Sequence, residues 1–238
     1  ALQPIQPSLI FQNPNFKFII LKISKYKNDG VTAPLQRTLP HEGFMTWNAF
    51  FGEFNAPVNG GEGMAGDAVC ECCPSDPFFY DGTYYNIIRN NNNNIRDMWL
   101  AVSEDGINWN EALDLDPTNW LTNTCPATGA SHTITDEGVL ITTYMSAPNG
   151  NRVYYSEVDL NSLELINSGM IDPTSVYPEN NPSVSANGGN IVTAWERNIG
   201  GYDIMVGLSS STELSNEIYI EDVTEGLGIN GHKRHPSV

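Results

Sequence analysis

The chain has 238 residues, enough to bury a hydrophobic core as one domain or as an array of repeats. Its 11 basic and 28 acidic residues give a formal net charge of −17, spread along the chain. This charge argues against nucleic acid and anionic membrane surfaces as partners, because both require basic patches. No run of about 18 apolar residues occurs, so the sequence predicts no membrane-spanning segment. Its 21 Gly and 15 Pro, with short alternating segments between turn residues, indicate an all-β protein.

Prolines at a regular spacing divide much of the chain into units. Four of them lie 52, 56 and 54 residues apart: Pro74, Pro126, Pro182 and Pro236. In each of the first three units a polar stretch leads through a two-residue turn into an apolar strand. The turns are Asp81-Gly82, Glu137-Gly138 and Asn187-Gly188. Such dipeptides supply the positive φ angles that tight hairpins need.

Two further strands complete each unit. A second, more exposed strand is predicted over residues 97–102, 152–157 and 203–208, and it ends at or near a serine: Ser103, Ser156 and Ser209. A last strand is predicted over 111–115, 163–168 and 217–222. With the polar arm that precedes each hairpin turn, each unit has four short strands, and four short strands in a repeated meander predict a β-propeller with blades of about 54 residues. The full blades are expected at 74–125, 126–181 and 182–235.

The two ends of the chain are predicted as incomplete blades. Residues 1–40 form a partial blade in which 16–24 is the third strand and 34–38 the fourth. Residues 41–73 form a degenerate blade or an insertion, and 236–238 start another inner strand. Propellers often close when the last strand completes the first blade. We therefore expect that the N- and C-terminal strands pair, or that the propeller in this chain is incomplete.

The four cysteines lie close to the first full unit, at Cys70, Cys72, Cys73 and Cys125. They favour disulfides, and hence a secreted, periplasmic or cell-surface protein. Of the three pairings, the one that joins the adjacent Cys72 and Cys73 is disfavoured by strain. We predict one short bridge within the cluster and one long bridge to Cys125. The alternative is a soft-metal site for Cu(I) or Zn²⁺.

One turn and the cysteine segment resemble a known family. Residues 103–109 resemble the Asp-box of bacterial-neuraminidase (BNR) repeats, one residue shorter, with Ser103, Asp105, Gly106 and Trp109 at the motif positions and Asn108 in place of Thr. The serine and aspartate would bond to turn amides and the tryptophan would pack between strands. With residues 70–74, 89, 95–98 and 125–126, the chain resembles exported sialidase-like propellers that carry a Cys-Asp/Glu-Cys-Cys-Pro segment. The resemblance covers residues 67–157 best.

Sialidase chemistry defines the catalytic candidates. It needs three arginines to clamp a carboxylate, a Tyr nucleophile backed by a Glu, and an Asp acid/base. Arg89 and Arg197 each lie 15 residues after the opening proline of their unit, and Glu196 and Tyr144 also lie at strand ends. The usual Phe/Tyr-Arg-Ile-Pro motif is absent from the sequence. The alternative is that these arginines pair with carboxylates between blades.

The sequence thus predicts a binding or scaffolding module at the cell surface or in a larger assembly, with a carbohydrate or protein partner. The alternatives are an exo-sialidase-type glycoside hydrolase and a soft-metal binder. No cofactor or structural metal is expected; the exception considered is Ca²⁺ at turn carboxylates, namely Asp76, Asp81, Asp136 and Glu137. His132 is isolated in the sequence and receives no predicted role.

Overall fold

The computed structural model describes residues 8–13, 16–23, 70, 73–106, 108–124, 126–210, 213–214, 218–224 and 236–238, and for 8–23 only the backbone. Three four-stranded antiparallel sheets make up most of this part. The first sheet contains β3 (Asp76–Tyr80), β4 (Thr83–Arg89), β5 (Met98–Ser103) and β6 (Asn110–Asp114). The second contains β7 (Ser131–Ile134), β8 (Val139–Ser146), β9 (Arg152–Asp159) and β10 (Glu164–Met170). The third contains β11 (Glu179–Asn187), β12 (Asn190–Asn198), β13 (Tyr202–Ser209) and β14 (Tyr219–Asp222).

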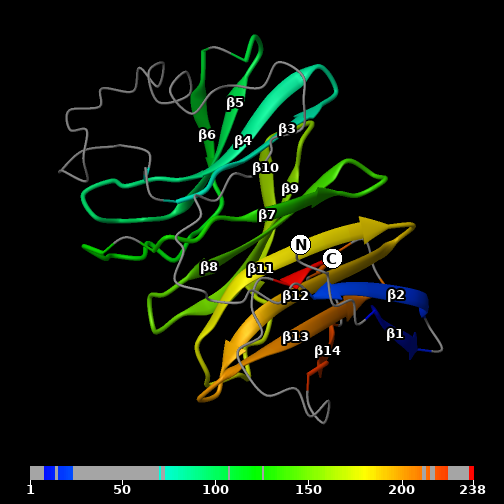
Figure 1. Cartoon of the computed structure of the whole chain (residues 1–238). Coiled ribbons are helices and arrows are strands. Elements are labelled where there is room, and N and C mark those ends of the chain that lie inside the picture. The colour runs from blue at the N-terminus through cyan, green and yellow to red at the C-terminus, as the bar shows by residue number, and fades with distance from the viewer. Residues whose placement is uncertain are drawn as a thin grey trace, which may run out of the picture.

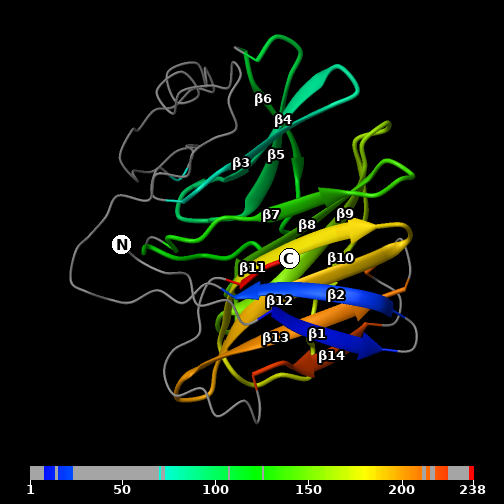
Figure 2. The same ribbon diagram turned by 45° about the vertical axis from the view of Figure 1, so that its right-hand side comes forward.

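Each sheet is a meander in which strands adjacent in the chain are adjacent in space. The three sheets follow one another in chain order (Figures 1 and 2) and pack face against face. This confirms the prediction of an all-β propeller with four-stranded blades. The Asp81-Gly82 turn lies where it was predicted, with φ angles of 44° and 83°. The other two turns differ from the prediction: the β7–β8 connection has four residues, 135–138, and the β11–β12 turn consists of Gly188 and Gly189, because Asn187 still belongs to β11. Among the described residues, no helix is long and apolar enough to cross a membrane.

The polar stretch after each opening proline forms the first of the four strands (β3, β7 or β11). One detail of the strand prediction is wrong. The strands predicted to be more exposed, β5, β9 and β13, are mostly buried. Both faces of a middle blade pack against neighbouring blades. Successive side chains of its second and third strands therefore point into two different buried interfaces, as in other sheets covered on both sides. Strand β9 also continues to Asp159, which makes Ser156 a buried interior residue.

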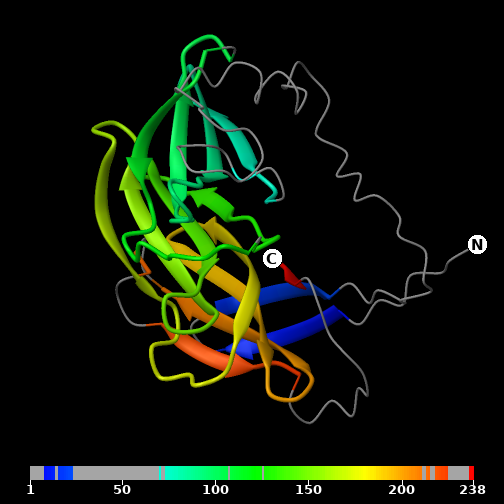
Figure 3. The ribbon, with the colours of Figure 1, turned by 90° about the vertical axis from the view of Figure 1, so that its left-hand side faces the viewer.

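A three-stranded sheet joins the two ends of the chain. Its order is β1 (Ser8–Asn13), β2 (Phe16–Ile23) and β15 (Pro236–Ser237). Pro236 pairs with Ile23, and Ser237 pairs with Lys22, so the predicted pairing of the two ends is confirmed; Figure 3 shows β15 between β2 and the third sheet. The strand predicted as third in its blade, over 16–24, is instead the middle strand. The predicted strand 34–38 lies outside the described residues, as does the unit 41–73 except for Cys70 and Cys73.

Apolar side chains and hydroxyl groups connect successive blades. Tyr85 and Leu100 of the first sheet share one buried cluster with Leu140 and Val158 of the second. A second cluster joins the second sheet to the third, and Trp195 lies fully buried in it. Hydrogen bonds also join the first strand of one blade to the neighbouring segment of the next. The hydroxyls of Ser131, Thr133 and Ser183 accept the backbone N–H groups of Val184, Ala186 and Val238 at 3.2, 3.1 and 3.3 Å.

The starts of the first two blades approach each other closely at Gly129. A Cβ atom added there would lie 2.4 Å from the carbonyl oxygen of Pro74, a backbone atom that cannot turn away. We expect Gly129→Ala to lower the free energy of unfolding by about 2 kcal/mol, because the two strand starts must separate. Urea unfolding followed by tryptophan fluorescence measures this change. The matched control is Gly201→Ala, whose Cβ would have no neighbour within 4 Å. Equal stability of the two variants would contradict the prediction.

Candidate functional site

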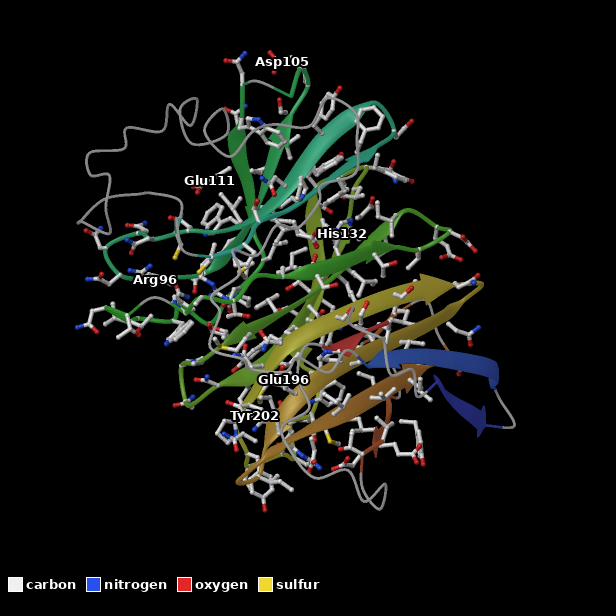
Figure 4. All side chains as sticks on the ribbon, viewed as in Figure 1. Arg96, Asp105, Glu111, His132, Glu196 and Tyr202 are labelled. Atoms are coloured by element: carbon white, nitrogen blue, oxygen red, sulfur yellow. The ribbon has the colours of Figure 1, made fainter. Side chains whose placement is uncertain are left out.

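The candidate functional residues gather at one end of the sheets, which we call the loop face. It carries the connections between second and third strands, 90–97, 147–151 and 199–201, and those between blades, 115–130 and 171–178. These connections bond to one another; Arg96 N, for example, donates to Trp120 O at 2.9 Å. In Figure 4, Arg96, Glu196 and Tyr202 lie toward this end, whereas Asp105 lies at the outer edge of the first sheet.

Arg89 is the centre of a buried polar cluster on the loop face. It ends β4 and is 1% exposed. One guanidinium nitrogen donates to the carbonyl oxygen of Arg96 at 2.7 Å, and another donates to that of Met145, in the second sheet, at 2.6 Å. Burial lowers the pKa of Arg89, and the nearby Cys73 and Asp116 oppose that effect. The side chain therefore holds two blades together.

Two carboxyl groups, those of Asp97 and Asp116, lie near this arginine, and a third, that of Asp114, lies next to Asp116. Burial is the main cause that raises the pKa of Asp97 to about 7 and that of Asp114 to about 6, and it also raises the pKa of Asp116. Asp97 Oδ1 accepts the backbone N–H of Trp120 at 3.0 Å. Asp116 is fully buried, and its proximity raises the pKa of Asp97 further. The cluster thus contains carboxyl groups that hold protons close to neutral pH.

The predicted nucleophile, Tyr144, lies in the same cluster but is fully buried. Its hydroxyl donates to the carbonyl oxygen of Leu115 at 2.6 Å and lies 3.0 Å from Ser156 Oγ. Burial raises the pKa of Tyr144 well above its usual value, and Asp116 raises it further. This environment stabilises the neutral phenol, whereas a nucleophilic tyrosine needs a stabilised phenolate.

The other two candidates lie in the third sheet. Arg197 forms an ion pair with Asp222 at 3.1 Å, and its guanidinium carbon lies 6.0 Å from the ring centre of Tyr177. Glu196 is buried in β12. The structure therefore brings Arg89 and Tyr144 into one cluster, and it gives Arg197 separate partners. Arg89 and Arg197 lie at the same distance from the opening proline of their units, but their side chains contact different groups.

The turn that resembles an Asp-box has the expected contacts. Ser103 Oγ accepts the N–H of Gly106 at 2.8 Å, and Asp105 Oδ1 accepts that of Asn108 at 2.8 Å. Gly106 has a φ of 73°. Trp109 is buried and its indole N–H donates to Gly106 O at 3.3 Å. The Asn108 side chain donates to Asp105 Oδ2 at 2.7 Å. These contacts give the turn a structural role, remote from the loop face.

Two of the four cysteines are described. Cys70 and Cys73 are buried thiols whose sulfur atoms lie 3.1 Å apart. The described residues contain no disulfide, and Cys72 and Cys125 lie outside them. The predicted short and long bridges therefore remain predictions. Within the part of the chain that the structure describes, no group of three or more His, Cys, Asp or Glu side chains is placed to hold a metal ion.

Two polar features were missed by the sequence reasoning. His132 Nδ1 of β7 lies 2.7 Å from Asp76 Oδ2 of β3, so this pair links the first strands of two successive blades. The ring of Phe78 stacks on the His132 imidazole. The second feature is a repeated Asp-x-Thr turn after the last strand of each blade, in which the aspartate Oδ1 accepts the threonine N–H at 3.2, 3.0 and 3.0 Å. The turns begin at Asp116, Asp172 and Asp222. The Asp-x-Thr pattern recurs in the sequence and could have predicted these turns. No sequence pattern indicates that His132 pairs with Asp76.

The loop face also exposes apolar side chains. Tyr177 is 46% exposed, and next to it Val176 is 84% exposed. Ile199 is 49% exposed and belongs to the β12–β13 connection, which bonds to this segment through Asn198 N and Pro178 O at 2.8 Å. We call Val176, Tyr177 and Ile199 the Tyr177 platform. The ring centre of the half-buried Trp120 lies 5.5 Å from the guanidinium carbon of Arg89, an arrangement similar to that of Tyr177 and Arg197.

No family model and no curated protein matches this chain. Its structure is similar to an endo-arabinanase from Bacillus licheniformis (16% identity, TM-score 0.42, 61% of this chain and 53% of that one). It is also similar to an endo-arabinase from Bacteroides thetaiotaomicron (16%, 0.45, 62% and 60%) and to a family 117 glycoside hydrolase from Zobellia galactanivorans (11%, 0.43, 62% and 54%). The matches thus span little more than half of those chains.

Proposed function

We propose that this protein is an exported, sialidase-like propeller domain that binds carbohydrate on its loop face without hydrolysing it. The observation that carries the proposal is the Tyr177 platform. A half-exposed tyrosine ring, backed by the Arg197 guanidinium and flanked by exposed Val176 and Ile199, offers a flat apolar surface with polar edges. A sugar ring has a matching shape, since its C–H groups form an apolar face and its hydroxyls a polar rim. Apolar surface beside a few placed polar groups is typical of ligand sites.

The environment of the predicted catalytic residues favours binding over sialidase-type hydrolysis. Tyr144 is buried with its hydroxyl bonded to a carbonyl oxygen, and Arg89 is held by two carbonyl oxygens. Neither group is presented to a ligand on the surface. The high acidic charge also disfavours an anionic sugar as the ligand. A neutral oligosaccharide is therefore the proposed ligand class.

A Tyr177→Ala variant tests the platform. We expect the protein to bind oligosaccharides in calorimetric titrations against a panel of arabino-oligosaccharides, xylo-oligosaccharides and sialyllactose. The variant should bind at least about fivefold more weakly, because an aromatic contact of this kind is worth about 1 kcal/mol or more. The matched control is Tyr219→Ala, which removes an exposed tyrosine from the outer strand β14. Equal affinity of Tyr177→Ala and wild type would refute the platform, and no binding to any sugar would leave a protein partner as the better reading.

A second candidate function is glycoside hydrolysis, and the protonation of Asp97 is the observation that favours it. A carboxyl group with a pKa of about 7 is suited to act as a general acid at neutral pH. Incubation of wild type, Asp97→Asn and Tyr144→Phe with arabinan and with sialyllactose separates the readings. Activity lost in Asp97→Asn and kept in Tyr144→Phe supports a carboxylate-based glycosidase. Activity lost in Tyr144→Phe supports the sialidase mechanism, and an inactive wild type rejects both.

A further inference from the structure

Cys70 and Cys73 form a pair with the spacing Cys-x-x-Cys. The Cys73 N–H donates to Cys70 O at 3.1 Å, which closes a turn, and the Cys70 N–H donates to Arg89 O at 2.7 Å, which anchors that turn to the end of β4. This backbone places both side chains on one side of the turn. Their sulfur atoms lie 3.1 Å apart in the buried interior.

The two thiols differ in their surroundings. A guanidinium nitrogen of Arg96 donates to Cys70 Sγ at 3.1 Å, and a neighbouring cation stabilises a thiolate over a thiol. The hydrogen bond to Cys70 is the largest cause that raises the pKa of Cys73 and burial is the next, and both are larger than the opposing effect of the nearby Arg89, which lowers it. Cys73 therefore keeps its proton and donates it toward Cys70. Cys70 is the more nucleophilic sulfur of the pair.

The sulfur separation favours a disulfide over a metal site. Two thiolates on a tetrahedral Zn²⁺, with Zn–S bonds of about 2.3 Å, lie about 3.8 Å apart. The observed 3.1 Å is shorter than that separation. It exceeds a disulfide bond by only about 1 Å, a gap that small side-chain rotations can close.

We propose that Cys70 and Cys73 are the partners of the short bridge, and that Cys70 initiates its formation. The Cys70 thiolate attacks a small-molecule disulfide such as glutathione disulfide, which forms a mixed disulfide and expels one glutathione thiolate. That thiolate takes the Cys73 proton, and the Cys73 sulfur attacks Cys70 Sγ and expels the second glutathione thiolate. Two protein thiols are oxidised and one glutathione disulfide is reduced to two thiol equivalents. This assignment leaves Cys72 and Cys125 for the long bridge.

Peptide mapping of the whole chain tests the pairing. Glu71 lies between Cys70 and Cys72, so a glutamate-specific protease separates Cys70 from the other two cysteines of the cluster. After oxidation with glutathione disulfide and digestion without reductant, we expect the Cys70 peptide to remain linked to the peptide that carries Cys72 and Cys73. The link should persist in Cys72→Ser and disappear in Cys73→Ser. Persistence of the link in Cys73→Ser, or a link from Cys70 to the Cys125 peptide, would overturn the pairing.

The order of attack has its own measurement. Two double variants isolate the thiols of the pair. Cys72→Ser with Cys73→Ser keeps Cys70 alone, and Cys72→Ser with Cys70→Ser keeps Cys73 alone. We expect Cys70 to form its mixed disulfide with glutathione at least about tenfold faster than Cys73 at neutral pH, because a thiolate rather than a thiol attacks. Equal rates would overturn the role of Cys70. Mass spectrometry of the native reduced protein with added Zn²⁺ gives a third check, since retention of the metal by both thiols would refute the disulfide assignment.

Discussion

Replacement of Arg89 by alanine is expected to lower the free energy of unfolding by about 4 kcal/mol, the largest destabilisation of any single change proposed for this protein. The substitution leaves two buried carbonyl oxygens, those of Arg96 and Met145, without a donor. Each unsatisfied group costs about 1–3 kcal/mol. It also opens a cavity at a fully enclosed side chain and removes the cation that faces Asp116. Because Met145 belongs to the next blade, the loss falls on the contact between the first two sheets.

Equilibrium unfolding in urea measures the effect, and Arg197→Ala is the matched control. Arg197 occupies the same sequence offset in its own unit, but its ion pair with Asp222 is partly exposed. Such pairs contribute about 1 kcal/mol or less. A loss below about 1.5 kcal/mol for Arg89→Ala, or losses of equal size in the two variants, would show that the Arg89 cluster does not hold the blades together.

The features predicted correctly from the sequence are those specified by neighbouring residues. The Asp81-Gly82 turn follows from the φ preferences of its two residues, and the turn from Ser103 to Trp109 follows from local hydrogen bonding. The four-strand period emerges because each blade repeats such signals. The burial of β5, β9 and β13 was misjudged, because strands covered on both sides lose the alternation that marks a face exposed to water.

The site depends on partners that come from other blades. Arg89 and Arg197 look equivalent in the sequence, yet Arg89 is enclosed because Met145 and Trp120 reach it from other parts of the chain. Tyr144 was chosen as a nucleophile from its position at a strand end, and the carbonyl group of Leu115 engages its hydroxyl. These contacts span 29 to 56 residues. No local pattern encodes them.

A second large effect is expected from Asp97→Asn, with the opposite sign. The folded-state pKa of Asp97, about 7, lies above the unfolded value of about 3.9. The folded state therefore holds the proton more tightly, and stability falls as the pH rises from about 4 to about 7. Asparagine mimics the protonated acid and can still accept the Trp120 N–H through its oxygen. We expect the variant to be more stable than wild type by about 4 kcal/mol at pH 8 and by only about 0.5 kcal/mol at pH 4.

Urea unfolding at pH 4, 6 and 8 resolves this difference, and Asp159→Asn is the control for its sign. Asp159 is the last residue of β9, at the start of the turn to β10, and the hydrogen bond from Asn161 N is the main cause that lowers its pKa. A lowered pKa contributes stability above the unfolded value, so Asp159→Asn cannot gain stability as the pH rises. A stability difference between Asp97→Asn and wild type that stays constant from pH 4 to pH 8 would show that Asp97 ionises as freely in the folded protein as in the unfolded chain. The same result would remove the general-acid argument for Asp97, because that argument depends on a proton retained near neutral pH.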